Sequence, residues 1–259
     1  MHTQNITSNK SLQIRLNANR TFGDFDFHAW IYEHYAFVPG MDVLDVGCGS
    51  GAQAIEALKR MGAKGSITAV DLSSESIAQL NRASGAPPNL QAEVGDMRKL
   101  ASLITERFRV KQYDLAHSTY ALFYAREHRA VLEAMRRALK PRARMIVTTP
   151  VGPNGLRQLV NELGFQTPEL EPIDQFGTRV LEPYFSAAFP RVEVLLGRNL
   201  LRIPNVEAVA ALYRSTAYYF PDAEERLLRI VRAQIASHGH FAFEKNSYMI
   251  IGHNDACAA

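Results

Sequence analysis

Three aspartates in the first part of the chain each follow a short hydrophobic run: Asp45, Asp71 and Asp96. Each run has the length of one buried strand, so each aspartate would mark the end of a strand. The carboxyl ends of parallel strands meet at one edge of a sheet, and such sheets bind ligands there. Because a carboxylate accepts hydrogen bonds from hydroxyl and amino groups, the three side chains predict a site for a small molecule with several donor groups.

A glycine-rich bend directly follows the first of these aspartates. Gly47, Gly49 and Gly51 alternate with other residues, and a helical pattern begins at Ala52. Glycine lacks a Cβ atom, so the backbone can turn tightly and a ligand can lie against it. The first amide groups of the helix point at the same place and favour a partly anionic cofactor. Gly47, Gly49 and Ala52 also fit the glycine pattern of dinucleotide-binding enzymes, so NAD remains an alternative.

The order of the motifs favours S-adenosylmethionine over NAD. Asp-Val-Gly-Cys-Gly-Ser-Gly at 45–51, Val-Asp-Leu-Ser at 70–73 and Val-Gly-Asp-Met at 94–97 closely resemble motifs of the class I S-adenosylmethionine-dependent methyltransferases. The resemblance implies that the first aspartate holds the ammonium group of the methionine moiety, the second the ribose hydroxyls and the third the adenine amine. It implies these cofactor contacts: Asp45, Gly47, Gly49, Gly51, Asp71, Leu72, Ser73, Asp96, Met97 and Ser118.

Each of the three carboxylates also has a purely structural interpretation. Asp45 could order the bend, Asp71 could cap the helix that begins at Ser74, and Asp96 could cap the helix after it. Ser73 or Ser74 can perform the capping instead, which leaves Asp71 available for the ribose. The motif context favours the cofactor role for all three carboxylates.

The candidates for catalysis follow the fourth predicted strand, and they are His117, Tyr120 and Tyr124. Many relatives have two histidines where this chain has Phe123 and Tyr124, so the resemblance supplies no base there. His117 could act as a general base, although a packed or surface histidine is the commoner explanation. A phenol is a poor base at neutral pH, so the tyrosines would position the acceptor by hydrogen bonds. Alignment of the reacting atoms supplies much of the rate, so a base is not required.

Alternating strand and helix patterns predict an α/β fold from Met41 onward. Strands are expected at 41–46, 66–70, 90–94, 113–117 and 144–149, and helices near 51–61, 74–84, 98–107, 127–139 and 154–163. This alternation implies a parallel sheet with helices on both faces. The resemblance implies a Rossmann-like sheet of seven strands, mostly parallel, whose last strand is antiparallel and lies between the fifth and sixth.

The second half of the chain is less regular, and the segment 161–190 is expected to be irregular or partly helical. The patterns predict a strand pair or one bent strand at 191–203, helices at about 205–217 and 223–237, and a final strand at 241–252. The predicted division is an N-terminal arm and lid helix at 1–39, a methyltransferase core at 40–204 and 240–254, and a helical insertion at 205–239. We expect the insertion to form part of the acceptor pocket.

The N-terminal arm is expected to be loose at its start. Hydrophobic residues alternate with polar ones at Leu12, Ile14 and Leu16, a pattern that is compatible with a short strand or with the edge of a helix. The aromatic residues from Phe22 to Phe37 predict a helix over about 27–36 that packs on the sheet. A lid over the cofactor and the acceptor, formed by residues 22–30, is the functional alternative.

Composition narrows the class of protein. The chain has 259 residues, of which 47% are hydrophobic, and a net charge of +3, which does not indicate a nucleic-acid partner. Neither a secretory signal nor an apolar run of membrane-spanning length is evident, so we expect a soluble cytoplasmic protein without a membrane partner. Cys48 and Cys257 do not predict a disulfide, and beyond the three aspartates no acidic cluster predicts a metal site.

The sequence therefore predicts an S-adenosylmethionine-dependent methyltransferase that modifies an oxygen or nitrogen of a small-molecule acceptor. Aromatic residues such as Phe22, Trp30 and Tyr124 would suit a flat or partly apolar acceptor. An NAD-dependent oxidoreductase and a non-catalytic cofactor-binding protein of the same fold are the alternatives. The acceptor, the methylated atom and the oligomeric state, monomer or homodimer, stay open.

Overall fold

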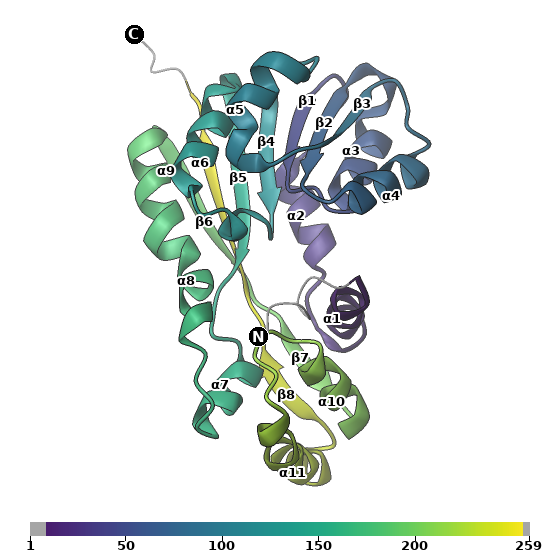
Figure 1. Ribbon diagram of the computed structural model, residues 1–259, viewed down its shortest axis with the longest axis vertical. Helices are drawn as coiled ribbons and strands as arrows, with labels where there is room; N and C mark the ends of the chain where they lie inside the picture. The colour runs from purple at the N-terminus through teal and green to yellow at the C-terminus, as the bar shows by residue number, and fades with distance from the viewer. Residues whose placement is uncertain (1–8, 256–259) are drawn as a thin grey trace. The chain divides into compact units, whose positions relative to one another are not determined.

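A seven-stranded sheet forms the centre of one of the chain's two compact units, with the strand order β3-β2-β1-β4-β5-β9-β6 (Figure 1). The computed structural model describes residues 9–255. The strands are β1 (Asp42–Val46), β2 (Ser66–Asp71), β3 (Leu90–Val94), β4 (Tyr113–Thr119), β5 (Leu139–Pro150), β6 (Arg191–Gly197) and β9 (Ser247–His253). The pairs β1–β2, β1–β4, β2–β3 and β4–β5 are parallel.

The last strand runs against its neighbours. Asn254, after the end of β9, accepts a hydrogen bond from Arg142 near the start of β5, whereas Asn246, before β9, accepts one from Val151 after the end of β5. β9 is therefore antiparallel to β5, and it lies between β5 and β6 in the sheet. The predicted Rossmann-like fold, with its antiparallel last strand between the fifth and sixth, is confirmed.

Helices cover both faces of this sheet (Figure 1). Each has one apolar side that packs inward, as α3 does through Ala54, Ala57 and Met61. The helical elements along this part of the chain are α2 (Phe27–Tyr35), α3 (Ala52–Met61), α4 (Ser74–Ser84), three short turns over 97–107 that include α5 (Leu100–Ser102), α6 (His128–Arg137) and α9 (Glu182–Ala188). These match the predicted helices to within a few residues.

The chain divides into two compact units, which we describe separately. The sheet unit comprises Trp30–Thr149, Phe176–Leu195 and the chain from Tyr248, and the helical unit comprises the chain up to Ala29, Pro150–Gln175 and Leu196–Ser247. The helical unit thus contains more than the insertion predicted at 205–239. The roles predicted for that insertion and for a lid at 22–30 stay predictions.

The helical unit has its own small sheet and its own core. β7 (Leu200–Ile203) pairs antiparallel with β8 (Phe241–Glu244), and Gly23 bridges to Leu201. Its helices are α1 (Asn9–Phe22), α7 (Gly155–Glu162), α8 (Glu171–Asp174), α10 (Val206–Arg214) and α11 (Pro221–His238). Tyr213 is fully buried in this core, and Tyr218, Tyr219 and Phe220 pack against it. These aromatic residues of the late insertion therefore serve the core.

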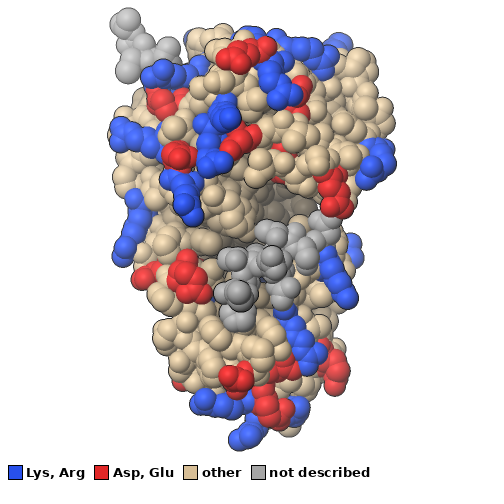
Figure 2. Space-filling view, in the orientation of Figure 1, with Lys and Arg blue, Asp and Glu red and all other residues tan. Residues whose placement is uncertain are grey.

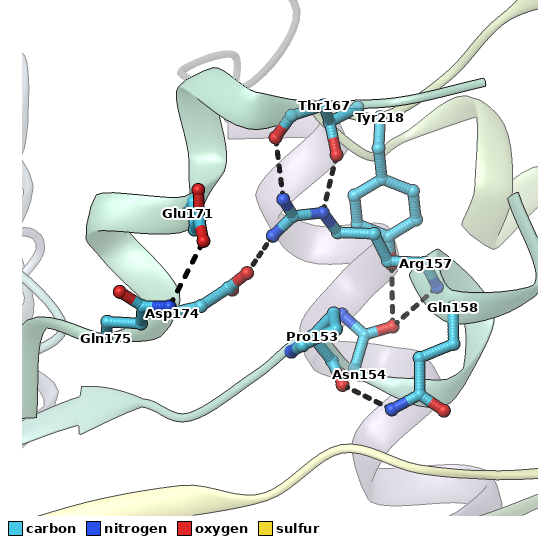
Figure 3. A network of polar contacts seen from close by, with 9 residues as sticks. All are labelled: Pro153, Asn154, Arg157, Gln158, Thr167, Glu171, Asp174, Gln175 and Tyr218. Atoms are coloured by element: carbon cyan, nitrogen blue, oxygen red, sulfur yellow. Dashed lines mark hydrogen bonds and ion pairs between the residues drawn. The ribbon is translucent and has the colours of Figure 1, made fainter. Parts of the chain in front are cut away.

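A buried arginine fixes the connection after α7 (Figure 3). Arg157 donates from Nε to the Thr167 hydroxyl at 2.6 Å and from Nη2 to the Thr167 carbonyl at 2.7 Å, and it forms an ion pair with Asp174. Asn154 caps α7 by accepting a hydrogen bond from the Arg157 amide at 3.1 Å, and it accepts another from the Tyr218 hydroxyl at 3.1 Å. Each of the three nitrogens of the buried guanidinium thus donates to an acceptor, and one of these acceptors is a carboxylate, as burial of a charge requires.

Two predictions about the secondary structure were wrong. The strand expected at 241–252 is divided into β8 and β9, which belong to different sheets, and the pair at 191–203 is divided in the same way into β6 and β7. The described part of the N-terminal arm, from position 9, is helical. Ile14, Ala18 and Phe22 stand four residues apart and face inward, whereas Leu12 and Leu16 are exposed, so the helical period decides the structure. Residues 1–8 and Cys257 lie outside the described residues.

Two surface features follow from the described residues. Lys and Arg are interspersed with Asp and Glu over the face shown in Figure 2. None of the helices between positions 9 and 255 is both long enough and apolar enough to cross a lipid bilayer.

Candidate functional site

The glycine bend after β1 adopts a conformation that side chains disfavour. Gly47, Gly49 and Gly51 have φ angles of 74°, 54° and 84°, all in the left-handed region. A Cβ atom on Gly47 would lie 2.3 Å from Cβ of Ala121, and one on Gly51 would lie 2.3 Å from Cδ1 of Leu80. A Cβ atom on Gly49 would have no atom within 4 Å. The first and third glycines are therefore needed for packing, and the middle one borders open space.

Asp71 is tied to this bend by the backbone. Its Oδ2 accepts a hydrogen bond from the Gly49 amide at 2.8 Å, and its Oδ1 accepts one from the Ser73 amide at 2.8 Å. Ser73 itself caps α4 through its hydroxyl, which accepts from the Ser76 amide at 3.2 Å. Each carboxylate oxygen can accept a second hydrogen bond. The predicted roles are thus compatible with the structure: Ser73 caps the helix, and Asp71 can still accept hydrogen bonds beside the bend.

Apolar side chains border the same edge of the sheet. Leu72 follows Asp71, and its side chain is 70% exposed. Met97 lies next to the bend, because its Cε is 3.4 Å from the position that a Cβ of Gly47 would occupy. The end of β2 and the turn after β3 therefore present apolar surface beside the carboxylates.

Asp96 is engaged by a residue that sequence reasoning missed. The Arg98 guanidinium donates from Nε to both carboxylate oxygens, at 2.8 Å and 3.0 Å, and the Arg98 amide donates to Oδ1 at 2.9 Å. These contacts lower the pKa of Asp96. Asp96 therefore caps the turn at Met97–Lys99 and stays ionised. An adenine amine would have to share this carboxylate with the guanidinium, and the only sequence signal was a cation two positions after the acid.

Asp45 is buried without a partner for one of its oxygens. Its exposed fraction is 1%, and Oδ2 has no hydrogen-bond partner among the described residues. Burial, and after it the charge of Asp71, raises the pKa of Asp45 to about 8. An unpartnered buried carboxylate oxygen is costly unless a cation or a donor meets it. The site therefore has the chemistry to hold an ammonium group.

His117 lies behind Asp45 and is fully buried. The two residues are paired in the β1–β4 register, and His117 Nδ1 is 3.6 Å from Asp45 Oδ1, too far for a hydrogen bond. Burial lowers the pKa of His117 to about 3, so the ring is neutral at pH 7. Because the side chain has no exposed surface, its burial disfavours the predicted role as a base that contacts the acceptor.

The ring of His117 is enclosed by Tyr35, whose part at this site the sequence analysis did not predict. The two ring centroids are 4.5 Å apart, and the buried Tyr35 hydroxyl shares a hydrogen bond of 2.5 Å with the hydroxyl of Thr119. Burial raises the pKa of Tyr35 well above its ordinary range, so the phenol stays protonated. These contacts between α2 and β4 hold His117 in place on the side of Asp45 that faces the core. They join positions more than eighty residues apart, which no local motif could have indicated.

The other predicted residues near the end of β4 lie in different environments. Ser118 is buried and donates to the carbonyl of Val46 at 2.7 Å, so its hydroxyl holds β4 to β1. Tyr120 directly follows β4 with a left-handed φ of 56°, and its amide donates to the carbonyl of Thr148 at 2.8 Å. Tyr124 is 60% exposed and packs against Phe123, with ring centroids 4.4 Å apart. The predicted catalytic residues therefore differ in exposure, from the fully buried His117 to the exposed Tyr124.

Comparison with known proteins identifies the family. Residues 37–171 match the family model described as a methyltransferase domain. The chain belongs to the methyltransferase domain family. The class I members of this family use S-adenosylmethionine as the methyl donor. The match covers every cofactor-binding residue that the sequence predicted, from Asp45 to Ser118.

Individual methyltransferases show more distant similarity. The chain is 27% identical over 185 residues to nocamycin O-methyltransferase of Saccharothrix syringae, a match that covers 70% of this chain and 60% of that protein. It is 40% identical over 75 residues to a ubiquinone biosynthesis O-methyltransferase of Albidiferax ferrireducens, which covers 28% of each. Among solved structures, a protein classed as a methyltransferase from Bacillus halodurans has a TM-score of 0.60 and 12% identity, with 89% of this chain and 100% of that one covered.

The geometry of this methyltransferase fits its family's cofactor. The middle glycine borders open space, and the carboxylate of Asp71 is held beside it with acceptor capacity left. The unpartnered oxygen of Asp45 lies at the start of the same bend. Together with exposed Leu72 these groups offer an ammonium partner, a hydroxyl partner and apolar surface, which are the contacts that a sulfonium nucleoside needs.

Proposed function

We propose that the protein transfers a methyl group from S-adenosylmethionine to an oxygen atom of a small-molecule acceptor. The observation that carries the proposal is the bend itself: the Asp71 carboxylate bonds the Gly49 amide, while a Cβ on Gly49 would meet nothing within 4 Å. The names of the two relatives, both O-methyltransferases, support oxygen as the methylated atom. The match spans 60% of the length of the first relative, so the methyl acceptor of that relative is not assigned to this protein.

The residues divide the binding work as follows in this proposal. Asp45 holds the ammonium group through its unpartnered Oδ2, and Asp71 accepts hydrogen bonds from the ribose hydroxyls. Leu72 and the Met97 side chain cover the adenine, whose amine shares the Asp96 carboxylate with Arg98. The sulfonium group of the bound cofactor supplies the electrophilic methyl carbon and the leaving group.

Alignment of the acceptor is the main catalytic contribution that we propose for the protein. Displacement at a methyl carbon needs the acceptor oxygen in line with the breaking bond, at about 3–3.5 Å, and such positioning supplies much of the rate. Tyr120 and Tyr124 are the candidates to contact the acceptor, because His117 is fully buried. A phenol or carboxylate acceptor reacts as its anion, so an acceptor that is ionised at neutral pH needs no protein base.

Calorimetry and a transfer assay test the proposal at two levels. The wild-type chain should bind S-adenosylmethionine and its demethylated product, and Asp71→Ala should weaken both by about tenfold or more, because a charge-assisted hydrogen bond contributes about 1.5–3 kcal/mol. No heat at millimolar ligand would exclude the cofactor assignment. Transfer of a labelled methyl group to a panel of phenols, carboxylates and amines then separates an O-methyltransferase from an N-methyltransferase.

Two alternatives make different predictions in the same experiments. A non-catalytic cofactor-binding protein would bind the nucleoside but label no acceptor in any panel. An NAD-dependent oxidoreductase would bind a nicotinamide dinucleotide in preference to S-adenosylmethionine. The resemblance of the motifs and the family match both favour the methyltransferase.

A further inference from the structure

The helical unit collects positive charge along α1. This helix carries Lys10, Arg15 and Arg20 but no acidic residue, and no acidic residue occurs in the chain before position 24. Arg15 is partly buried and donates to the backbone carbonyl of Ser215. Side chains four positions apart share one face of a helix, so Arg15 and Asn19 lie on the same side of α1.

Lys245 reaches this same part of α1. It follows β8, and its backbone amide continues the β7–β8 ladder by donating to the carbonyl of Asn199 at 2.8 Å. Its ammonium group donates to Oδ1 of Asn19 at 3.2 Å. The described residues place no carboxylate within ion-pair distance of this ammonium group. Burial, and after it the positive charge of Arg15, lowers the pKa of Lys245 to about 8.

Arg157, the buried arginine of the same unit, is compensated differently. It forms an ion pair with Asp174 and two hydrogen bonds with Thr167, so a carboxylate meets its charge where it is buried (Figure 3). Lys245 is partly buried, and among the described residues it has a single neutral acceptor for an ammonium group that carries three donors. The helical unit therefore provides a carboxylate for Arg157 and none for Lys245.

Tyr218 connects the start of α7 with the core of this unit. Its hydroxyl donates to Oδ1 of Asn154 at 3.1 Å, and burial raises its pKa to about 12 against the smaller opposing effects of that hydrogen bond and of the charges of Arg157 and Arg15. The positive charge of Arg15 thus acts on both Tyr218 and Lys245. Two like charges in a partly buried region repel each other, and this repulsion is relieved when an anion lies between or beside them.

We propose that Lys245, together with Arg15 and Asn19, forms a binding site for an oxyanion, namely a carboxylate or phosphate group of a small molecule. The remaining ammonium donors of Lys245 would bind the anion, and the charge of Arg15 would strengthen the interaction. Asn19 holds the ammonium group in place from α1. Every residue of this site lies within the helical unit, so the proposal does not depend on methyl transfer.

Titration calorimetry of the full chain with inorganic phosphate and, separately, with acetate tests the site. In low-salt chloride buffer at pH 7 and without S-adenosylmethionine, at least one of the two anions should bind. Lys245→Met should weaken that binding by about tenfold or more, the loss expected for a charge-assisted hydrogen bond, and Lys245→Arg should retain most of it. Binding of phosphate alone assigns the site to phosphate groups, and binding of acetate alone assigns it to carboxylates.

The matched control is Lys10→Met, which removes the same charge from the exposed start of α1. Its anion affinity should change by less than about twofold, because an exposed charge is screened by solvent and salt. Lys245→Met removes a poorly solvated ammonium group and should fold, which an unchanged far-UV circular dichroism spectrum and unfolding of the helical unit at an unchanged urea concentration would verify. Equal losses in both variants, unchanged affinity in Lys245→Met, or no binding of either anion by the wild type would overturn the proposal.

Discussion

Asp45 and His117 should give the sheet unit an unusual dependence on pH in the absence of cofactor. The pKa of Asp45 is raised from 3.8 to about 8, so between these values the folded state holds a proton that the unfolded state has released. Stability therefore falls as pH rises through this window, by about 1.4 kcal/mol for each pH unit. The pKa of His117 is lowered from 6.5 to about 3, so in that range the unfolded state holds the extra proton and stability rises with pH.

The two slopes have opposite signs and cancel where the windows overlap. From about pH 4 to pH 6.5, Asp45 and His117 together should therefore cause no net change of the unfolding free energy with pH. Between pH 6.5 and pH 8 only Asp45 contributes, so the unfolding free energy should fall by about 2 kcal/mol over this interval. Asp45→Asn cannot ionise, and it should remove this fall while leaving every other titrating group in place.

Urea unfolding at pH 6.5 and pH 8, without cofactor, measures the effect. Trp30 is the single tryptophan of the chain and lies in the sheet unit, so its fluorescence reports the unit that contains the pair. The quantity to compare is the change between the two pH values in wild type minus the change in Asp45→Asn. A difference near zero would refute the assignment of a raised pKa to Asp45.

The same variant links the pH effect to the cofactor. If the ammonium group of S-adenosylmethionine meets Asp45, the carboxyl group ionises on binding, and about one proton should be released at pH 7. Calorimetry in buffers with different ionisation enthalpies counts that proton. Asp45→Asn should bind more weakly and release none. Equal proton release by both variants would place the ammonium group elsewhere.

Three further predictions concern single positions. Gly49→Ala and Gly85→Ala both place a side chain at a left-handed φ with nothing within 4 Å, so each should lose about 1–2 kcal/mol of stability, but only Gly49→Ala should also lose S-adenosylmethionine affinity in calorimetry. Asp96→Ala should weaken cofactor binding more than Arg98→Ala does, because the guanidinium competes with the adenine amine for the carboxylate; the reverse order in the same titration would exclude the adenine contact. His117→Gln should change kcat/KM for a methyl acceptor by less than about tenfold, and a larger loss with unchanged cofactor affinity would restore the histidine as a base.

The cofactor edge of the sheet could be predicted because its information is local. The bend, Asp71 and Asp96 each lie within a few residues of the strand that positions them, and the strands follow one another with short connections. The sequence alone did not show which groups donate hydrogen bonds to these carboxylates. Asp71 is shared between two amides and Asp96 is held by Arg98, contacts that depend on the backbone conformation after each strand.

The environment of His117 illustrates a different limit. A histidine near the end of a strand can face either the ligand or the core. The sequence pattern does not distinguish the two directions, and only a histidine that faces the ligand can act as a base. The deciding contact comes from Tyr35 on α2, whose ring covers the histidine from far away in the sequence. The aromatic pattern predicts a packed helix over about 27–36 but not which side chain it covers, and the ring of Tyr35 on this helix determines the chemistry available to His117.

The division of two predicted strands marks the boundary of the helical unit. Four consecutive polar residues, Glu244 to Ser247, separate the hydrophobic runs at 241–243 and 248–251, a signal that the prediction of one strand over 241–252 did not use. The break at Lys245 and Asn246 is set by partners elsewhere: Lys245 bonds Asn199 and Asn19, and Asn246 accepts a hydrogen bond from the Asn199 amide at 3.0 Å. The same two-residue connection that ends β8 thus supplies the proposed oxyanion ligand. A residue that pattern reasoning treats as part of a strand instead lies in a connection, held by its backbone amide, so the Lys245→Met and Lys245→Arg variants change the charge of the proposed site and leave that backbone contact in place.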